Sequence, residues 1–282
     1  MERREFISYL YCTILLPKWL ISQETKYGKI FDHIVNKALN ENWSTLPISE
    51  VLVNVALEFL DFPYLGGSLD VDLEEKCIVT FEGFDCFTFF EVSLCFARII
   101  KKRKFTFYDL VDEVTYTRYR GGKIQDYSSR LHYSSDWIYD NIQKGVVQDR
   151  TAKLGGTKIT FEVNYMSANP HLYKQLNKND ELMKKIKAVE QEIRKRNYYV
   201  ISKSEVHAVE NRLEAGNIIF IATSKRGLDY SHTGICVVKD GDRRLLHAST
   251  KYNRVLLDRP IVQYLAENMT ASGITVVELL EP

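Results

Sequence analysis

The sequence of 282 residues has few cysteines, and none is paired at a spacing that metal sites use. Its five cysteines are an odd number and include no Cys-x-x-Cys arrangement. Zinc sites and the disulfide frameworks of small secreted proteins both depend on such pairs. We therefore expect neither a zinc site nor a disulfide scaffold, and we expect no cofactor.

Long apolar runs and an excess of charge are also lacking. No stretch reaches the roughly 18 apolar residues that a membrane-spanning helix needs. The net charge is only +1, whereas nucleic-acid-binding proteins usually carry a clear excess of basic residues. No repeat, low-complexity segment or proline-rich linker sets a domain boundary. These absences predict no membrane span and no nucleic-acid partner. The sequence does not reveal the oligomeric state, for which we expect a monomer.

The N-terminus has the pattern of an export signal. Arg3 and Arg4 precede a short apolar run at residues 7–16, as in bacterial twin-arginine and general export signals. Cleavage is expected near Ser22, without a small-x-small triplet to mark it. We predict an export signal over residues 1–22 and a location in the periplasm or cell envelope. The alternative is the amphipathic first helix of a cytosolic protein.

The order of the predicted elements indicates an α+β fold. Helical periodicity comes first, and short β-branched or alternating runs fill the chain from Asn217 onward. Helices followed by a strand meander are typical of α+β proteins. The predicted helices are 25–40, 49–60 with Ser49 as cap, 86–100, 107–119, 180–195 and 261–268. The predicted strands are 218–222, 233–238, 244–249, 255–257 and 274–280, with strand-like runs at 77–81 and 146–161.

Cys86, at the start of a strongly apolar helix, is a candidate nucleophile. Gly83 makes a turn before it and Asp85 caps the helix. The unpaired N–H groups at a helix start favour an anion, so the thiol is predicted to titrate below about 8.5 and to be thiolate near neutrality. The alternative is a small buried apolar residue.

Two histidines are predicted to meet on one sheet face. Asp240-Gly241 is a strong signal for a two-residue hairpin turn, which fixes the pairing of the flanking strands. Counting back from the turn makes His232 and His247 diagonal neighbours, with Cβ atoms roughly 5 to 8 Å apart. At that separation one imidazole can hydrogen-bond the other.

These residues suggest a catalytic set of nucleophile, base and orienting group. Cys86 would attack, His232 would take and return the proton, and His247 would hold the imidazole in the required tautomer. Two histidines without a role, or a zinc pair that lacks a third ligand, are the alternatives. Sequence order does not show that Cys86 meets this face.

The segment 127–140 is unusually dense in polar and aromatic residues. A solvated loop rarely has this composition, which favours a binding surface. The competing interpretation is a helix that starts with Ser135 or Asp136 as cap and packs its aromatic side chains inward.

Several segments together resemble the NlpC-type cell-wall cysteine peptidases of the papain-like class. The resemblance rests on Pro-Tyr-x-Gly-Gly at 63–67, Gly-Phe-Asp-Cys at 83–86, His-x-Gly-Ile at 232–235 and His-Ala-Ser at 247–249. Within that superfamily, residues 83–91, 119–141, 231–237 and 245–250 are similar to the bacterial N-acetylmuramoyl-L-alanine amidase-like family. The similarity runs from about residue 63 to the C-terminus.

The resemblance implies one papain-like domain over residues 23–282, with family-specific insertions at about 105–200. Its nucleophile helix would pack on a C-terminal antiparallel sheet. Cys86 would be the nucleophile, His232 the general base and acid, and His247 the third polar residue. The Tyr64 hydroxyl would lie near the reacting carbonyl, and the Cys86 backbone N–H would be an oxyanion donor. Substrate binding is assigned to Arg130, His132, Tyr133, Asp136 and Trp137.

The implied reaction is hydrolysis of the amide between the lactyl group of N-acetylmuramic acid and L-alanine, through a thioester at Cys86. Phe87 replaces the small residue that many members of the superfamily carry after the cysteine. It is predicted to narrow the neighbouring pocket and to favour muropeptide fragments over intact peptidoglycan. The alternatives are a γ-D-glutamyl-diamino acid endopeptidase and a non-catalytic muropeptide-binding module.

Overall fold

A computed structural model describes residues 18–282, with side chains described from residue 28 onward. The predicted export segment, residues 1–22, lies outside this part except for the helical backbone that begins at Lys18. No helix in the described part is long and apolar enough to cross a membrane.

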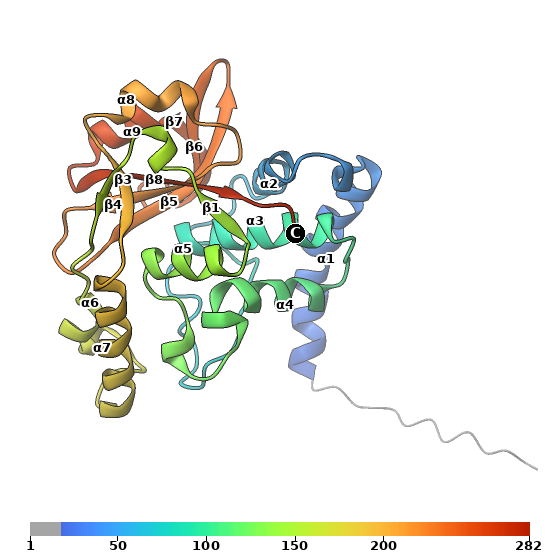
Figure 1. The fold of residues 1–282 in the computed structure, drawn as a ribbon. Coiled ribbons are helices and arrows are strands. Elements are labelled where there is room, and N and C mark those ends of the chain that lie inside the picture. Colours follow the sequence, from blue (N-terminus) through green and yellow to red (C-terminus); the bar gives the residue numbers. More distant parts are fainter. Residues whose placement is uncertain (1–17) are drawn as a thin grey trace, which may run out of the picture.

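The described chain forms a helical N-terminal half and a strand-rich C-terminal half, so the predicted α+β class is confirmed (Figure 1). The helices are α1 (Lys18–Asn40), α2 (Ile48–Leu57), α3 (Cys86–Lys101), α4 (Phe107–Arg118), α5 (Ser134–Gln143), α6 (Tyr165–Ala168), α7 (Asp180–Arg194), α8 (Val206–Val209) and α9 (Ile261–Glu267). The strands are β1 (Val147–Asp149), β2 (Thr157–Ile159), β3 (Tyr198–Ser202), β4 (Ile218–Thr223), β5 (Tyr230–Lys239), β6 (Asp242–Ser249), β7 (Arg254–Pro260) and β8 (Ala271–Leu279).

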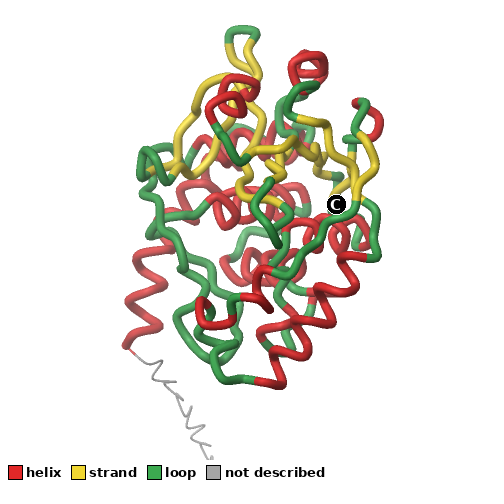
Figure 2. The backbone as a smooth tube through the Cα atoms, turned by 90° about the vertical axis from the view of Figure 1, so that its left-hand side faces the viewer, coloured by secondary structure: helices red, strands yellow, loops and turns green. Residues whose placement is uncertain are grey.

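The strands form one antiparallel sheet in the order β2-β3-β8-β4-β5-β6-β7, with β1 also paired to β8. In Figure 2 the strands gather at the upper end of the molecule and most of the helices lie beneath them. Strands β4 to β7 follow one another as a meander, which is the arrangement that their short turns predict.

Both faces of the sheet are covered. Along β4, Ile218 and Phe220 belong to the core shared with α3, whereas Ile219 and Ile221 belong to a second core under α8 and α9. This period of two is the pattern of a strand that is buried on both faces. The sheet therefore separates α3 from α9 (Figure 1).

Helix α3 is the central element of the helical half, because 13 of its 16 residues are buried. Its start is fixed by a capping box. The Asp85 side chain accepts a hydrogen bond from the Thr88 backbone N–H at 2.7 Å, and the Asp85 N–H donates to the Thr88 hydroxyl at 3.0 Å. This confirms the predicted aspartate cap and sets where Cys86 lies.

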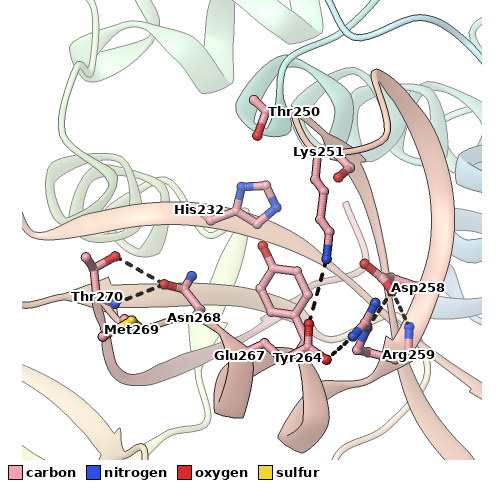
Figure 3. Close-up of a pocket in the computed structure, with 11 residues that line it drawn as sticks. His232, Thr250, Lys251, Asp258, Arg259, Tyr264, Glu267, Asn268, Met269 and Thr270 are labelled. Carbon is pink, nitrogen blue, oxygen red and sulfur yellow. Dashed lines mark hydrogen bonds and ion pairs between the residues drawn. The ribbon is translucent and has the colours of Figure 1, made fainter.

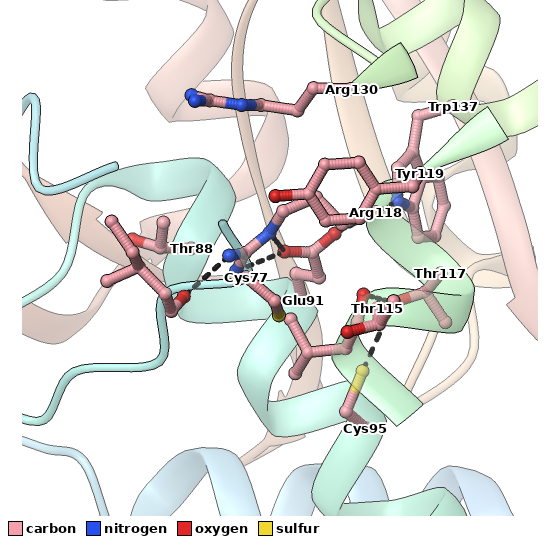
Figure 4. A network of polar contacts seen from close by, with 12 residues as sticks. Cys77, Thr88, Glu91, Cys95, Thr115, Thr117, Arg118, Tyr119, Arg130 and Trp137 are labelled. Carbon is pink, nitrogen blue, oxygen red and sulfur yellow. Dashed lines mark hydrogen bonds and ion pairs between the residues drawn. The ribbon is translucent and has the colours of Figure 1, made fainter. Parts of the chain in front are cut away.

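A buried ion pair ties α3 to α4 (Figure 4). The Arg118 Nε donates to the Glu91 carboxylate at 2.7 Å, and neither side chain is more than 2% exposed. The Trp137 indole N–H of α5 donates to the same carboxylate at 3.3 Å. Burial raises the pKa of Glu91, and the Arg118 charge opposes that shift.

Some local predictions were wrong. Residues 77–81 form no strand. The Ile78 carbonyl of this segment instead accepts a hydrogen bond from the Arg118 guanidinium. Helix α2 begins after Pro47 and not after Ser49, because proline sets the extended backbone before the first helical turn. Strand β3 was not predicted. It lies between β2 and β8, so its pairing partners are far from it in sequence.

Candidate active site

The two histidines of the β5–β6 hairpin meet as the sequence predicts. The pairing runs from Lys239 opposite Asp242 to Ile235 opposite Leu246, in the register that the two-residue turn requires. The His232 Nε2 and the His247 Nδ1 are 2.6 Å apart. No group of three metal-ligating side chains occurs within the part of the chain that the structure describes.

Strand β7 adds a carboxylate that the sequence analysis missed. The Asp258 Oδ2 lies 3.3 Å from the His247 Nε2, while its Oδ1 accepts from the backbone N–H and the Nε of Arg259. The pKa of Asp258 is lowered chiefly by the hydrogen bond from His247. Asp258 lies two residues beyond Leu256, which is opposite His247, and at the point where the pairing of β6 with β7 shifts register. Sequence spacing therefore carries little signal for this contact.

The Asp258 carboxylate determines which nitrogens of His247 and His232 carry a proton. A charged carboxylate only accepts, so the His247 Nε2 carries the proton and its Nδ1 is an acceptor. The His232 Nε2 then donates to that Nδ1, which leaves the His232 Nδ1 unprotonated. Asp258, through His247, therefore holds His232 in the tautomer that can accept a proton at Nδ1.

Cys86 lies where α3 begins, against the start of β5. The backbone N–H groups of Cys86, Phe87 and Thr233, the residue that follows His232, act to lower the pKa of its thiol. Tyr64 is close as well: burial, then the charges of Cys86 and Asp85, raises the pKa of its phenol to about 12. The structure thus brings the Cys86, His232, His247 and Tyr64 of the sequence prediction into one region.

The pKa of the Cys86 thiol is shifted upward, opposite to the sequence-based prediction. Burial, followed by the charge of Asp85, raises the pKa of Cys86 to about 12, although the three N–H groups act in the opposite direction. Burial, and next the neighbouring His247, lowers the pKa of His232 to about 3, and Asp258 only partly offsets this. The prediction of a thiolate near neutrality is therefore wrong for the resting site, where thiol and imidazole are both neutral.

Tyr264 of α9 is a second residue that the sequence analysis missed. Its ring stacks on His232, with centroids 5.8 Å apart and planes inclined by 21°, and it meets His247 edge-on at 5.2 Å. The charge of Cys86 is among the causes that raise its pKa, after burial. Tyr264 therefore packs against both imidazoles.

A cavity of about 320 Å³ opens beside this group. His232, Asp258 and Tyr264 form one of its walls. The turn after β6, which carries Lys251, and the segment after α9, which carries Asn268, form the others (Figure 3). A small ligand in this cavity would contact the imidazole of His232 directly.

The five residues assigned to substrate binding have partners inside the protein instead. Their contacts are Arg130 with Asp70 and Glu75, the His132 Nε2 with the Tyr127 carbonyl, the Tyr133 hydroxyl with Glu190, Asp136 with Arg120 and Arg196, and Trp137 with Glu91. All are buried except His132, which is partly buried. Residues 134–143 form α5, so the competing interpretation of a helix is confirmed, although its cap is Tyr133 and not Ser135 or Asp136. Trp137 of this helix is buried, whereas Tyr139 is exposed. None of the five lines the cavity.

Comparisons with known proteins give one family match and several similar crystal structures. A family model described as AmiA-like, N-acetylmuramoyl-L-alanine amidase-like, matches residues 54–274. The crystal structure of an N-acetylmuramoyl-L-alanine amidase from Bacteroides uniformis is 30% identical, with a TM-score of 0.78, and covers 83% of this chain and 99% of its own. A Bacteroides fragilis protein provisionally named a xylanase is 32% identical, with a TM-score of 0.74 and coverages of 80% and 99%.

A Legionella pneumophila protein shares the fold alone, with 19% identity, a TM-score of 0.70 and coverages of 92% and 97%. No curated protein gives a match.

Proposed function

This chain belongs to the N-acetylmuramoyl-L-alanine amidase-like family, and on that basis we propose that it is a cysteine amidase. Its proposed substrate is the amide between the lactyl group of N-acetylmuramic acid and L-alanine in peptidoglycan fragments. The observation that carries the cysteine mechanism is the hydrogen-bonded chain from Asp258 through His247 to His232. His232 lies on β5, which packs against α3, the helix that begins at Cys86.

In the proposed reaction, the Cys86 sulfur attacks the lactyl carbonyl carbon as its proton passes to the His232 Nδ1. The negative oxygen of the tetrahedral intermediate accepts hydrogen bonds from the Cys86 backbone N–H and the Tyr64 hydroxyl. When the C–N bond breaks, His232 gives its proton to the leaving nitrogen of L-alanine, and a thioester remains. Water then attacks this thioester, His232 takes the water proton, and the sulfur regains a proton as the acid leaves.

The neutral resting pair fits this sequence of steps. A base that is neutral at rest can accept the thiol proton during attack. The imidazolium that forms is then stabilised by the charge of Asp258, which raises the pKa of His232. The substrate must therefore be present for the thiolate to form.

We also propose a domain type and a cellular location for the protein. We assign residues 23–282 to one catalytic domain of the papain-like, NlpC type, with insertions at about 105–200 and an export signal at 1–22. The contact of α3 with β5 and β6 supports that assignment. The amidase-like family supports a proposed location outside the cytoplasm, and recycling of muropeptides is the proposed role.

Two other functions fit the site less well. A silent binding module has no need of the Asp258–His247–His232 chain. A glycosidase needs two carboxyl groups flanking the bond that is cut. At this site, however, Asp258 is occupied by His247 and Arg259.

Mass spectrometry of products from a defined muropeptide tests the function. Release of a free peptide that begins with L-alanine is expected, whereas a sugar that retains L-Ala-D-Glu would indicate the γ-D-glutamyl endopeptidase. Cys86→Ala should reduce the rate at least about a thousandfold. The matched control is Cys77→Ala, which removes another partly buried thiol and should leave the rate unchanged. A Cys86→Ala protein that cleaves as well as wild type would refute the cysteine mechanism.

A further inference from the structure

We propose that the cavity beside His232 is a leaving-group subsite, which binds a free carboxylate of the peptide through Lys251 and the side-chain amide of Asn268. This inference rests on the amidase function proposed above. It names the feature of the peptide that the enzyme would select.

The chemistry of the reaction decides which part of the substrate enters the cavity. His232 must hand its proton to the leaving nitrogen, so the peptide departs on the side where His232 is accessible. His232 forms a wall of the cavity, whereas Cys86 and Tyr64 do not line it. The peptide therefore extends into the cavity, and the sugar with its lactyl group lies on the side of Tyr64.

Of the two permanent cations that line the cavity, Lys251 and Arg259, Lys251 makes fewer contacts. The Arg259 guanidinium already contacts Asp258, Glu267 and the Tyr252 hydroxyl. The Lys251 Nζ is 3.8 Å from the Glu267 carboxylate, beyond hydrogen-bond distance, and its side chain is 67% exposed. An incoming carboxylate can thus gain a charge-assisted hydrogen bond from Lys251 without breaking one.

Asn268 supplies a second donor. Its Oδ1 accepts hydrogen bonds from the Thr270 N–H, the Thr270 hydroxyl and the Ala271 N–H, at 3.1–3.2 Å. These bonds fix the orientation of the amide, and Figure 3 shows its nitrogen turned away from Thr270. The Nδ2 donors therefore face the space that the carboxylate would enter.

The proposed substrate has a group of this kind in the expected place. The carboxyl group of L-alanine is bound in an amide, and D-glutamate is linked onward through its side chain. The α-carboxylate of D-glutamate is thus the free carboxylate nearest the scissile bond. The subsite selects peptides in which that group is ionised over peptides in which it is amidated.

Two muropeptides that differ only in this group, D-glutamate or D-isoglutamine, test the inference. Wild type should have a kcat/KM about fivefold higher for the acid, mostly through KM, because the ion pair is partly exposed. Lys251→Gln should bring that ratio to about one, and Lys251→Arg should keep most of it. Lys187→Gln, at an exposed lysine of α7, is the matched control and should retain the wild-type ratio.

Asn268→Asp gives an independent check that preserves local structure. It keeps the Oδ1 acceptor but replaces the donor with a negative oxygen, so this variant should prefer the amidated substrate. Equal kcat/KM of wild type for both substrates, or an unchanged ratio in Lys251→Gln, would overturn the subsite alone. If wild type cleaves neither muropeptide, both the amidase function and the subsite are refuted.

Discussion

Cys86 is expected to be a neutral thiol at neutral pH, and its alkylation rate measures this directly. With a pKa of about 12, the thiolate fraction at pH 7 is about 10⁻⁵, against about 3% for a free cysteine with a pKa of about 8.5. Iodoacetamide should therefore modify Cys86 about three thousandfold more slowly than a free cysteine. The rate should rise about tenfold with each unit of pH up to the pKa.

Two opposing effects set this outcome. The N–H groups of Cys86, Phe87 and Thr233 stabilise the thiolate and lower the pKa of Cys86. Removal of the sulfur from water and the charge of Asp85 raise that pKa, and burial is the largest of these contributions. The net direction is upward because backbone dipoles replace only part of the lost hydration.

The assay follows modification of the Cys86 peptide by mass spectrometry, with the absorbance of thiolate at 240 nm as a second measure. Cys86→Ser provides the baseline, since the other cysteines remain in it. A Cys86-dependent step in absorbance with a midpoint below pH 7, or alkylation faster than that of free cysteine, would refute the neutral pair. The proton would then have moved to His232 before the substrate arrived.

Three further outcomes are expected. Since burial lowers the pKa of His232 to about 3 and the base must be neutral, kcat/KM should stay flat from pH 8 to about pH 5; an acid limb near 6.5 would contradict this. Asp258→Asn should lower kcat/KM about tenfold, since one charge at about 10 Å and an effective dielectric constant of about 20 contributes about 1.5 kcal/mol; full activity in steady-state assays would exclude a positioning role. Glu91→Ala leaves the buried Arg118 unpaired and should cost about 3 kcal/mol or more in urea unfolding, whereas Glu192→Ala, which breaks an exposed ion pair with Lys195, should leave the unfolding midpoint nearly unchanged.

The sequence by itself determined the local features of this protein. The Asp85 cap and the Asp240-Gly241 turn each depend on hydrogen bonds between residues a few positions apart, so their consequences could be predicted. The cap places Cys86 at a helix start, and the turn fixes the register that brings His232 to His247. The class of the fold followed from the same local patterns.

The tertiary structure alone decided the surroundings of these residues. Asp258 and Tyr264 reach the histidines only because β7 and α9 fold back onto β6, and sequence spacing carries little trace of that approach. In segment 127–140, Tyr133 and Trp137 point inward because their polar atoms bond to Glu190 and Glu91 on other elements. Burial also reversed the predicted pKa shift of Cys86, since desolvation depends on every element packed around the sulfur and not on its own helix.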